Sequence, residues 1–153
     1  MYTSLVWLAF EVGAAAIPTP VWTHDYGLAM RRATAEGKPL AVFIGSGKKG
    51  WTDVCENGEP SATARRLLEE QYVCLYVDAA QPGQRHLVEA FEAERLPMLV
   101  VSDRSGVYQA YRQPGALSDA RLVQVLQAYC RSDVPEQPAA FAHPAAPVRG
   151  CRT

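Results

Sequence analysis

The residues best suited to chemistry lie in one glycine-rich segment, residues 45–55, which reads GSGKKGWTDVC. A thiol beside the start of a helix has a lowered pKa, because the helix dipole and unpaired N–H groups stabilise the thiolate. We expect Cys55 to hold such a position, with Lys48 and Lys49 adding positive charge if the loop folds over it. A thiolate there can form a mixed disulfide or be oxidised to sulfenic acid. The alternative is a partly buried, inert Cys55.

The same segment does not match a nucleotide-binding loop. That motif, G-x-x-x-x-G-K-[ST], needs a lysine followed by serine or threonine after its last glycine, and Gly50 is followed by tryptophan. Backbone N–H groups of such a loop can still hold an anion. We predict a flexible loop here and no cofactor.

The remaining cysteines and the histidines form no recognisable metal or redox motif. The chain has four cysteines and three histidines, which are Cys55, Cys74, Cys130, Cys151, His24, His86 and His143. No pair has C-x-x-C or zinc-ligand spacing, so we assign no metal site. Cys74 is expected to be a small core residue. Cys130 and Cys151 either form a disulfide, if the protein is exported, or stay free in a disordered tail.

The composition indicates an ordinary globular domain. The 153 residues are 48% hydrophobic and 20% charged, which suits one domain with extensions. The 15 basic and 16 acidic residues are interspersed, with a net charge of −1. This pattern weighs against binding to nucleic acid or to an anionic membrane surface.

Apolar spacing predicts alternating helices and strands. Four helices and four strands are expected, the helices over residues 25–36, 61–72, 84–94 and 118–130, and the strands over 40–45, 72–78, 97–102 and 107–112. The last two strands are joined by a turn and should form a hairpin. The order predicts an α/β fold: a four-stranded mixed sheet with helices on both faces, closed by the hairpin and a final helix.

The two ends of the chain have different characters from the domain, which we place at residues 21–132. Residues 1–20 contain a short apolar run and small residues, but Glu11 interrupts the run and no basic start precedes it. They are expected to be an export signal or an N-terminal arm, and the run is too short to span a bilayer. Residues 133–153 are rich in proline and alanine and are expected to be disordered.

Residues 22–130 resemble the thioredoxin-like superfamily. The resemblance is carried by the Lys38-Pro39 pair before the first buried strand, by Trp51, by the strand at 72–78, and by Leu96-Pro97-Met98 before the hairpin. It is closest to the exported or periplasmic branch, so we expect an exported or periplasmic location, with the cytoplasm as the alternative.

The resemblance implies a degenerate redox motif. In the family the tryptophan is followed by C-x-x-C, whose first cysteine attacks as a thiolate. Here Thr52 stands at that position before Cys55, and a hydroxyl cannot form a disulfide. Active relatives often carry a buried carboxylate in the first strand, where this chain has Val42. Pro97 matches the family's cis-proline, which lies beside the redox motif and exposes a backbone edge to an extended peptide; a trans proline at an edge strand is the alternative.

Two functions from different classes follow from these residues. The first is a non-catalytic module, expected to be a monomer, that binds a protein or extended peptide in a groove beside Pro97, with Trp51 and Thr52 lining the site. The alternative is a monothiol disulfide oxidoreductase or redox sensor acting through Cys55, with Cys151 as a resolving partner. A hydrolase or metalloenzyme has no supporting constellation of side chains.

Overall fold

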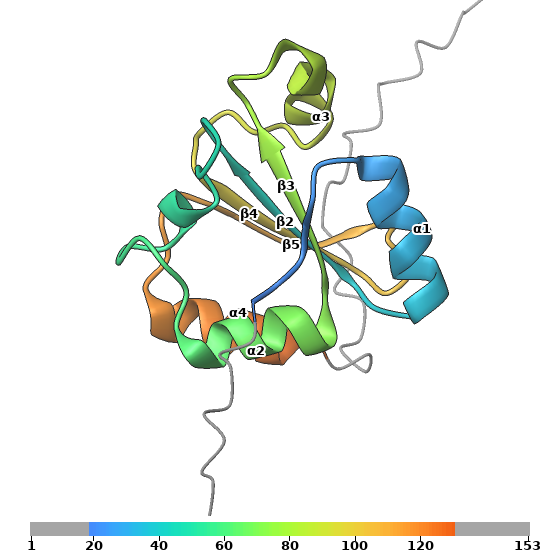
Figure 1. Ribbon diagram of the computed structural model, residues 1–153, viewed down its shortest axis with the longest axis vertical. Coiled ribbons are helices and arrows are strands. Elements are labelled where there is room, and N and C mark those ends of the chain that lie inside the picture. Colours follow the sequence, from blue (N-terminus) through green and yellow to red (C-terminus); the bar gives the residue numbers. More distant parts are fainter. Residues whose placement is uncertain (1–18, 131–153) are drawn as a thin grey trace, which may run out of the picture.

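The computed structural model describes residues 19–130, which form a five-stranded sheet flanked by helices (Figure 1). The strands are β1 (Trp22–Thr23), β2 (Leu40–Gly45), β3 (Val73–Asp78), β4 (Met98–Ser102) and β5 (Gln109–Pro114). The α-helices are α1 (Tyr26–Glu36), α2 (Ala62–Gln71), α3 (Arg85–Ala90) and α4 (Asp119–Cys130), and two 3-10 turns are η1 (Thr52–Val54) and η2 (Pro82–Gln84).

Strand β2 lies at the centre of the sheet, whose order is β1-β3-β2-β4-β5. It pairs in parallel with β3, with Ala41 opposite Cys74, and antiparallel with β4, with Ala41 opposite Val101. Every residue of β2, β3 and β4 is buried. Their continuous apolar runs therefore reflect a sheet that is covered on both faces.

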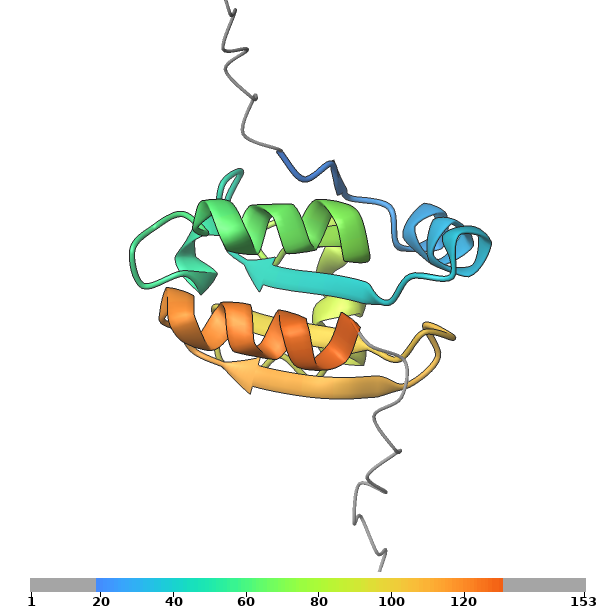
Figure 2. The ribbon, with the colours of Figure 1, turned by 90° about the horizontal axis from the view of Figure 1, so that it is seen from below.

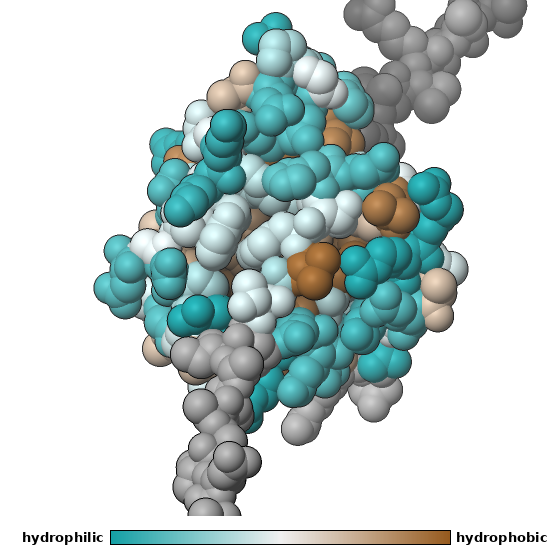
Figure 3. Space-filling view, in the orientation of Figure 1, coloured by the Kyte–Doolittle hydropathy of each residue, from teal (hydrophilic) through white to brown (hydrophobic). Residues whose placement is uncertain are grey.

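Two hydrophobic clusters cover the two faces of the sheet, and Figure 2 shows α2 and α4 on the nearer face. Helices α2 and α4 lie side by side on one face, where they pack on Ala41 and Phe43. Helices α1 and α3 cover the other face, which receives Leu40, Val42 and Ile44. The alternation follows from the two-residue period of a strand. On the face drawn in Figure 3, hydrophobic side chains form a few separate spots among hydrophilic ones.

Local signals explain where the helices begin and end. The Asp25 side chain accepts a hydrogen bond from the Leu28 N–H at the start of α1. Gly37 ends that helix in the left-handed region, with φ of 62°, which glycine adopts without strain. The Ser61 side chain accepts from the Ala64 N–H and caps α2. These positions agree with the helix boundaries predicted from the sequence.

The structure corrects three predicted elements. The sheet has five strands rather than four, because the short β1 pairs with β3 through Trp22 and Thr23. Helix α3 ends at Ala90, since the backbone of Glu92 turns into the left-handed region with φ of 50°. Strand β5 begins later than predicted because Tyr108 belongs to the hairpin turn, where its N–H donates to the Asp103 carboxylate.

The predictions for the two ends of the chain fall largely outside the described residues. They are the signal or arm predicted over residues 1–20, of which only 19 and 20 are described, the tail over 133–153, and the pairing of Cys130 with Cys151. Between residues 19 and 130, none of the helices combines the length and apolar character needed to cross a membrane.

Candidate functional site

The loop after β2 is compact and is held by the end of β3. The Tyr76 hydroxyl donates to the Gly47 carbonyl, and the Gly47 N–H donates to Asp78 Oδ1 at 2.7 Å. Gly50 lies so close to the Ser46 backbone that a Cβ atom at Gly50 would be 2.5 Å from the Ser46 nitrogen. Glycine is therefore required at this contact.

Trp51 and Thr52 are both engaged within the domain. The Trp51 ring stacks on Trp22 with centroids 5.1 Å apart, and Trp22 meets Phe43 edge-on at 4.9 Å. The Thr52 hydroxyl donates to the Lys49 carbonyl at 2.7 Å. Trp51 thus packs the loop against the hydrophobic cluster. The hydrogen bond of the Thr52 hydroxyl stabilises the turn at the start of η1.

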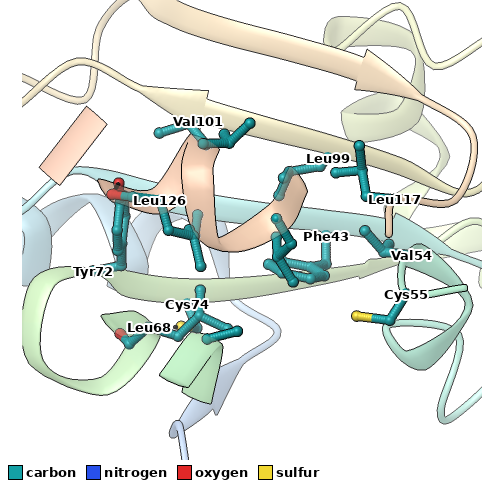
Figure 4. Close-up of a cluster of buried hydrophobic side chains, with 14 of the residues drawn as sticks. Phe43, Val54, Cys55, Leu68, Tyr72, Cys74, Leu99, Val101, Leu117 and Leu126 are labelled. Atoms are coloured by element: carbon teal, nitrogen blue, oxygen red, sulfur yellow. Dashed lines mark hydrogen bonds between the residues drawn. The ribbon is translucent and has the colours of Figure 1, made fainter. Parts of the chain in front are cut away.

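Cys55 follows η1 and forms a single parallel β-bridge with Leu117. The Leu117 N–H donates to the Val54 carbonyl at 2.7 Å, and the Glu56 N–H donates to the Leu117 carbonyl at 3.0 Å. The Cys55 side chain is only 5% exposed and lies at one end of the cluster that contains Phe43 and Val54 (Figure 4).

The predicted helix-start position of Cys55 is wrong. Helix α2 begins at Ala62, several residues later, because Ser61 rather than Cys55 caps it. Burial, aided by the negative charge of Asp119, raises the pKa of the Cys55 thiol from 9.0 to about 11. An apolar environment disfavours the charged thiolate, so the direction is opposite to the one predicted.

Pro97 is linked to the Cys55 region by the segment after β5. The peptide bond between Leu96 and Pro97 is cis. The Pro97 carbonyl accepts a hydrogen bond from the Gly115 N–H at 2.7 Å, and two residues later Leu117 pairs with the backbone around Cys55. Residues 115–117 therefore connect the two sequence-predicted site residues through the backbone.

Val42 and Cys74 both lie in the core. Val42 is 1% exposed and belongs to the cluster under α1 and α3, whereas Cys55 belongs to the cluster on the opposite face. The position where the resemblance expects a carboxylate is thus apolar and faces away from Cys55. Burial raises the pKa of Cys74 to about 12, which fits the predicted role as a small core residue.

A polar hollow that the sequence reasoning missed lies where three parallel strands end. It is lined by His24, Lys48, Tyr76, Asp78 and Gln81. The signal was present in the sequence, since polar residues follow or end β1, β2 and β3, and ligands of open α/β sheets bind outside the carboxyl ends of strands. Across residues 19–130, no group of three or more His, Cys, Asp or Glu side chains is placed to hold a metal ion.

Comparisons with known proteins identify the fold. No family model matches the chain, and no curated protein sequence matches it either. A thioredoxin from Thermus thermophilus superposes with a TM-score of 0.63 at 20% identity, covering 82% of this chain and 98% of that one. The DsbH oxidoreductase gives 0.59 at 17% identity, covering 84% and 94%. A mutant thioredoxin from Halobacterium salinarum gives 0.54 at 17% identity, covering 78% and 97%.

Proposed function

We propose that this chain, whose fold is thioredoxin-like, is a redox-degenerate, non-catalytic module that binds a protein segment in extended conformation beside Pro97. The observation that carries the proposal is the state of Cys55, which is 5% exposed with a pKa raised to about 11. Thiol exchange needs an accessible thiolate. The other motif position holds Thr52, whose hydroxyl is bonded to the loop backbone.

The backbone beside Pro97 supports the binding half of the proposal. Leu96 is 41% exposed, and its N–H and C=O groups make no hydrogen bond with any residue between 19 and 130. An extended peptide recognises such free backbone groups by strand-like hydrogen bonds and places its side chains against nearby apolar surface. The exposed Leu96 side chain supplies that surface.

The alternative function is thiol–disulfide exchange by Cys55 acting alone. It requires the Cys55 segment to open, because the flanking Val54 and Glu56 backbone groups are bonded to Leu117 and the thiol is buried. These contacts oppose exchange. They favour the binding role over the monothiol role.

A peptide array tests the proposal. We expect the full chain to bind a subset of immobilised peptides, and Leu96→Asp to weaken that binding at least tenfold, because a charge then replaces the apolar contact. Val107→Asp is the matched control, since Val107 is exposed to 68% in the hairpin turn at the other end of β4. It should change binding less than twofold, and circular dichroism checks that both variants are folded.

Two results contradict the proposal. One is an array on which the wild-type chain binds no peptide, or on which Leu96→Asp and Val107→Asp bind the peptides with equal affinity. The other is turnover of a mixed-disulfide substrate by the wild-type chain that disappears in Cys55→Ser, which supports the oxidoreductase alternative instead.

A further inference from the structure

The hollow at the strand ends is formed by the topology of the sheet. Strands β1, β3 and β2 run parallel and are neighbours, so their carboxyl ends meet at one edge, near α3 in Figure 1. The space there is about 220 Å³. At about 30 Å³ for each water in the liquid, it has room for roughly seven water-sized groups. The part of a ligand that enters this hollow must therefore be small.

Asp78 places a carboxylate with one free oxygen on the wall of the hollow. The residue is only 4% exposed. Its Oδ1 accepts two hydrogen bonds, from the Gly47 N–H at 2.7 Å and from the Ala80 N–H at 2.9 Å. Oδ2 accepts none from residues 19–130. Oδ2 is not among the fully buried polar atoms, so it is open to a donor group, such as a cation, in the space beside it.

Lys48 brings the opposite charge to the same hollow. Lys48 lines the space, is exposed, and forms no ion pair within the described part of the chain. The loop that carries it is fixed through Gly47 by the hydrogen bonds to Tyr76 and Asp78. Lys48 is thus carried by a held backbone at the hollow that Asp78 also lines.

The other wall of the hollow is aromatic. The His24 ring meets the Tyr76 ring edge-on, with centroids 5.6 Å apart. The nitrogens of the His24 ring make no hydrogen bond with residues 19–130, so they are available to a ligand. Gln81 adds an amide that can both donate and accept.

We infer that this hollow binds the zwitterionic head of a small free α-amino acid. The ligand's ammonium group would donate to Asp78 Oδ2, and its carboxylate would accept from Lys48 Nζ. A simple anion is repelled by Asp78 and a simple cation by Lys48, whereas a zwitterion pairs with both. The inference is independent of peptide binding beside Pro97.

The test is a titration of the isotopically labelled full chain with L-alanine, followed by NMR shifts of backbone amides. We expect saturable binding in the millimolar range, with the largest shifts around Lys48 and Asp78. Propionate lacks the ammonium group and propylamine lacks the carboxylate, so each should bind at least tenfold more weakly than L-alanine. Equal binding by either probe, or no saturation with L-alanine, overturns the inference.

Two neighbouring lysines give a matched pair of variants. Lys48→Gln removes one charge-assisted bond and should weaken L-alanine binding about tenfold. Lys49→Gln removes the adjacent exposed lysine, which does not line the hollow, and should change binding less than twofold. Equal effects of the two substitutions would place the ligand elsewhere.

Asp78→Asn examines the carboxylate without removing the loop contacts. The asparagine oxygen can still accept from the Gly47 and Ala80 N–H groups, while its NH₂ group replaces the free oxygen. We expect at least a tenfold loss of L-alanine binding and no loss of propionate binding. Unchanged L-alanine binding in a folded Asp78→Asn protein refutes the role of the carboxylate.

Discussion

The reactivity of Cys55 towards an alkylating reagent follows directly from its surroundings. Burial and the charge of Asp119 raise its pKa from 9.0 to about 11. At about pH 8 a thiol with the ordinary pKa is roughly 10% thiolate, and one with the raised pKa is roughly 0.1% thiolate. The folded chain should therefore hold about 100-fold less Cys55 thiolate than the denatured chain at the same pH.

Timed alkylation with iodoacetamide, read by mass spectrometry of the Cys55 peptide, measures this difference. The rate in the folded chain should be at least about 100-fold below the rate in urea, because burial also restricts access of the reagent. Its pH midpoint should lie about two units higher. Cys130, which is half-buried at the end of α4, reports in the same sample that the reagent is active.

A fast reaction would refute the reasoning. Two results would show that the thiol is not held in the cluster with Val54 and Phe43. One is an alkylation rate of folded Cys55 within tenfold of its rate in urea. The other is a pH midpoint of that rate below the ordinary pKa of the thiol. The segment bonded to Leu117 would then open readily, and the case for a non-catalytic module would lose its main support.

The same raised pKa makes stability depend on pH. The unfolded chain loses the Cys55 proton first, from about pH 9 upward, while the folded chain keeps it until about pH 11. Deprotonation thus favours the unfolded state, and about 1.4 kcal/mol of stability should be lost between about pH 8 and pH 10. Urea unfolding of the wild type and of Cys55→Ala isolates this term, because the difference between them should fall by that amount. A constant difference contradicts the pKa.

Two substitutions probe how the layers and the loop are held. Tyr72 follows α2 directly, and its hydroxyl donates to the Leu126 carbonyl of α4 at 2.6 Å. Tyr72→Phe removes this bond and should lower the free energy of unfolding by about 1–2 kcal/mol in urea titrations; no change would mean that water replaces the bond. Gly50→Ala puts a methyl group against the Ser46 backbone and should cost more than about 2 kcal/mol in the same assay, while Gly83→Ala, which meets nothing within 4 Å, should cost less than about 0.5 kcal/mol. Equal losses in the two glycine variants would contradict the close packing of the loop.

The central strands and the capped helices could be predicted from the sequence alone. The runs at 40–45 and 73–77 are apolar without alternation, which only a doubly covered strand explains in so short a length. The helix ends were also readable from local residues. Asp25 and Ser61 cap the starts of α1 and α2, and Gly37 ends α1, as their positions in the sequence predict. The positions of these strands and helix ends are determined by residues within or next to them.

Other features depend on contacts between distant parts of the chain. Two residues, Trp22 and Thr23, become a strand only because β3 offers them an edge. The burial of Cys55 depends on Leu117, which lies much later in the sequence. The backbone of Leu117 forms a β-bridge with Cys55, and the thiol is buried there. Local spacing could place Cys55 near a helix, but it could not show this partner.

The position of β2 in the sheet also bears on how the chain leaves the ribosome. This strand, Leu40–Gly45, is uncharged and apolar, and both of its neighbours are made after it. During synthesis one edge of β2 stays unpaired until β3, which starts at Val73, has emerged. The other edge stays unpaired until β4, which starts at Met98, has emerged. A nascent chain that stalls within this interval presents an open, aggregation-prone edge, so translation speed between these points should affect the yield of folded protein.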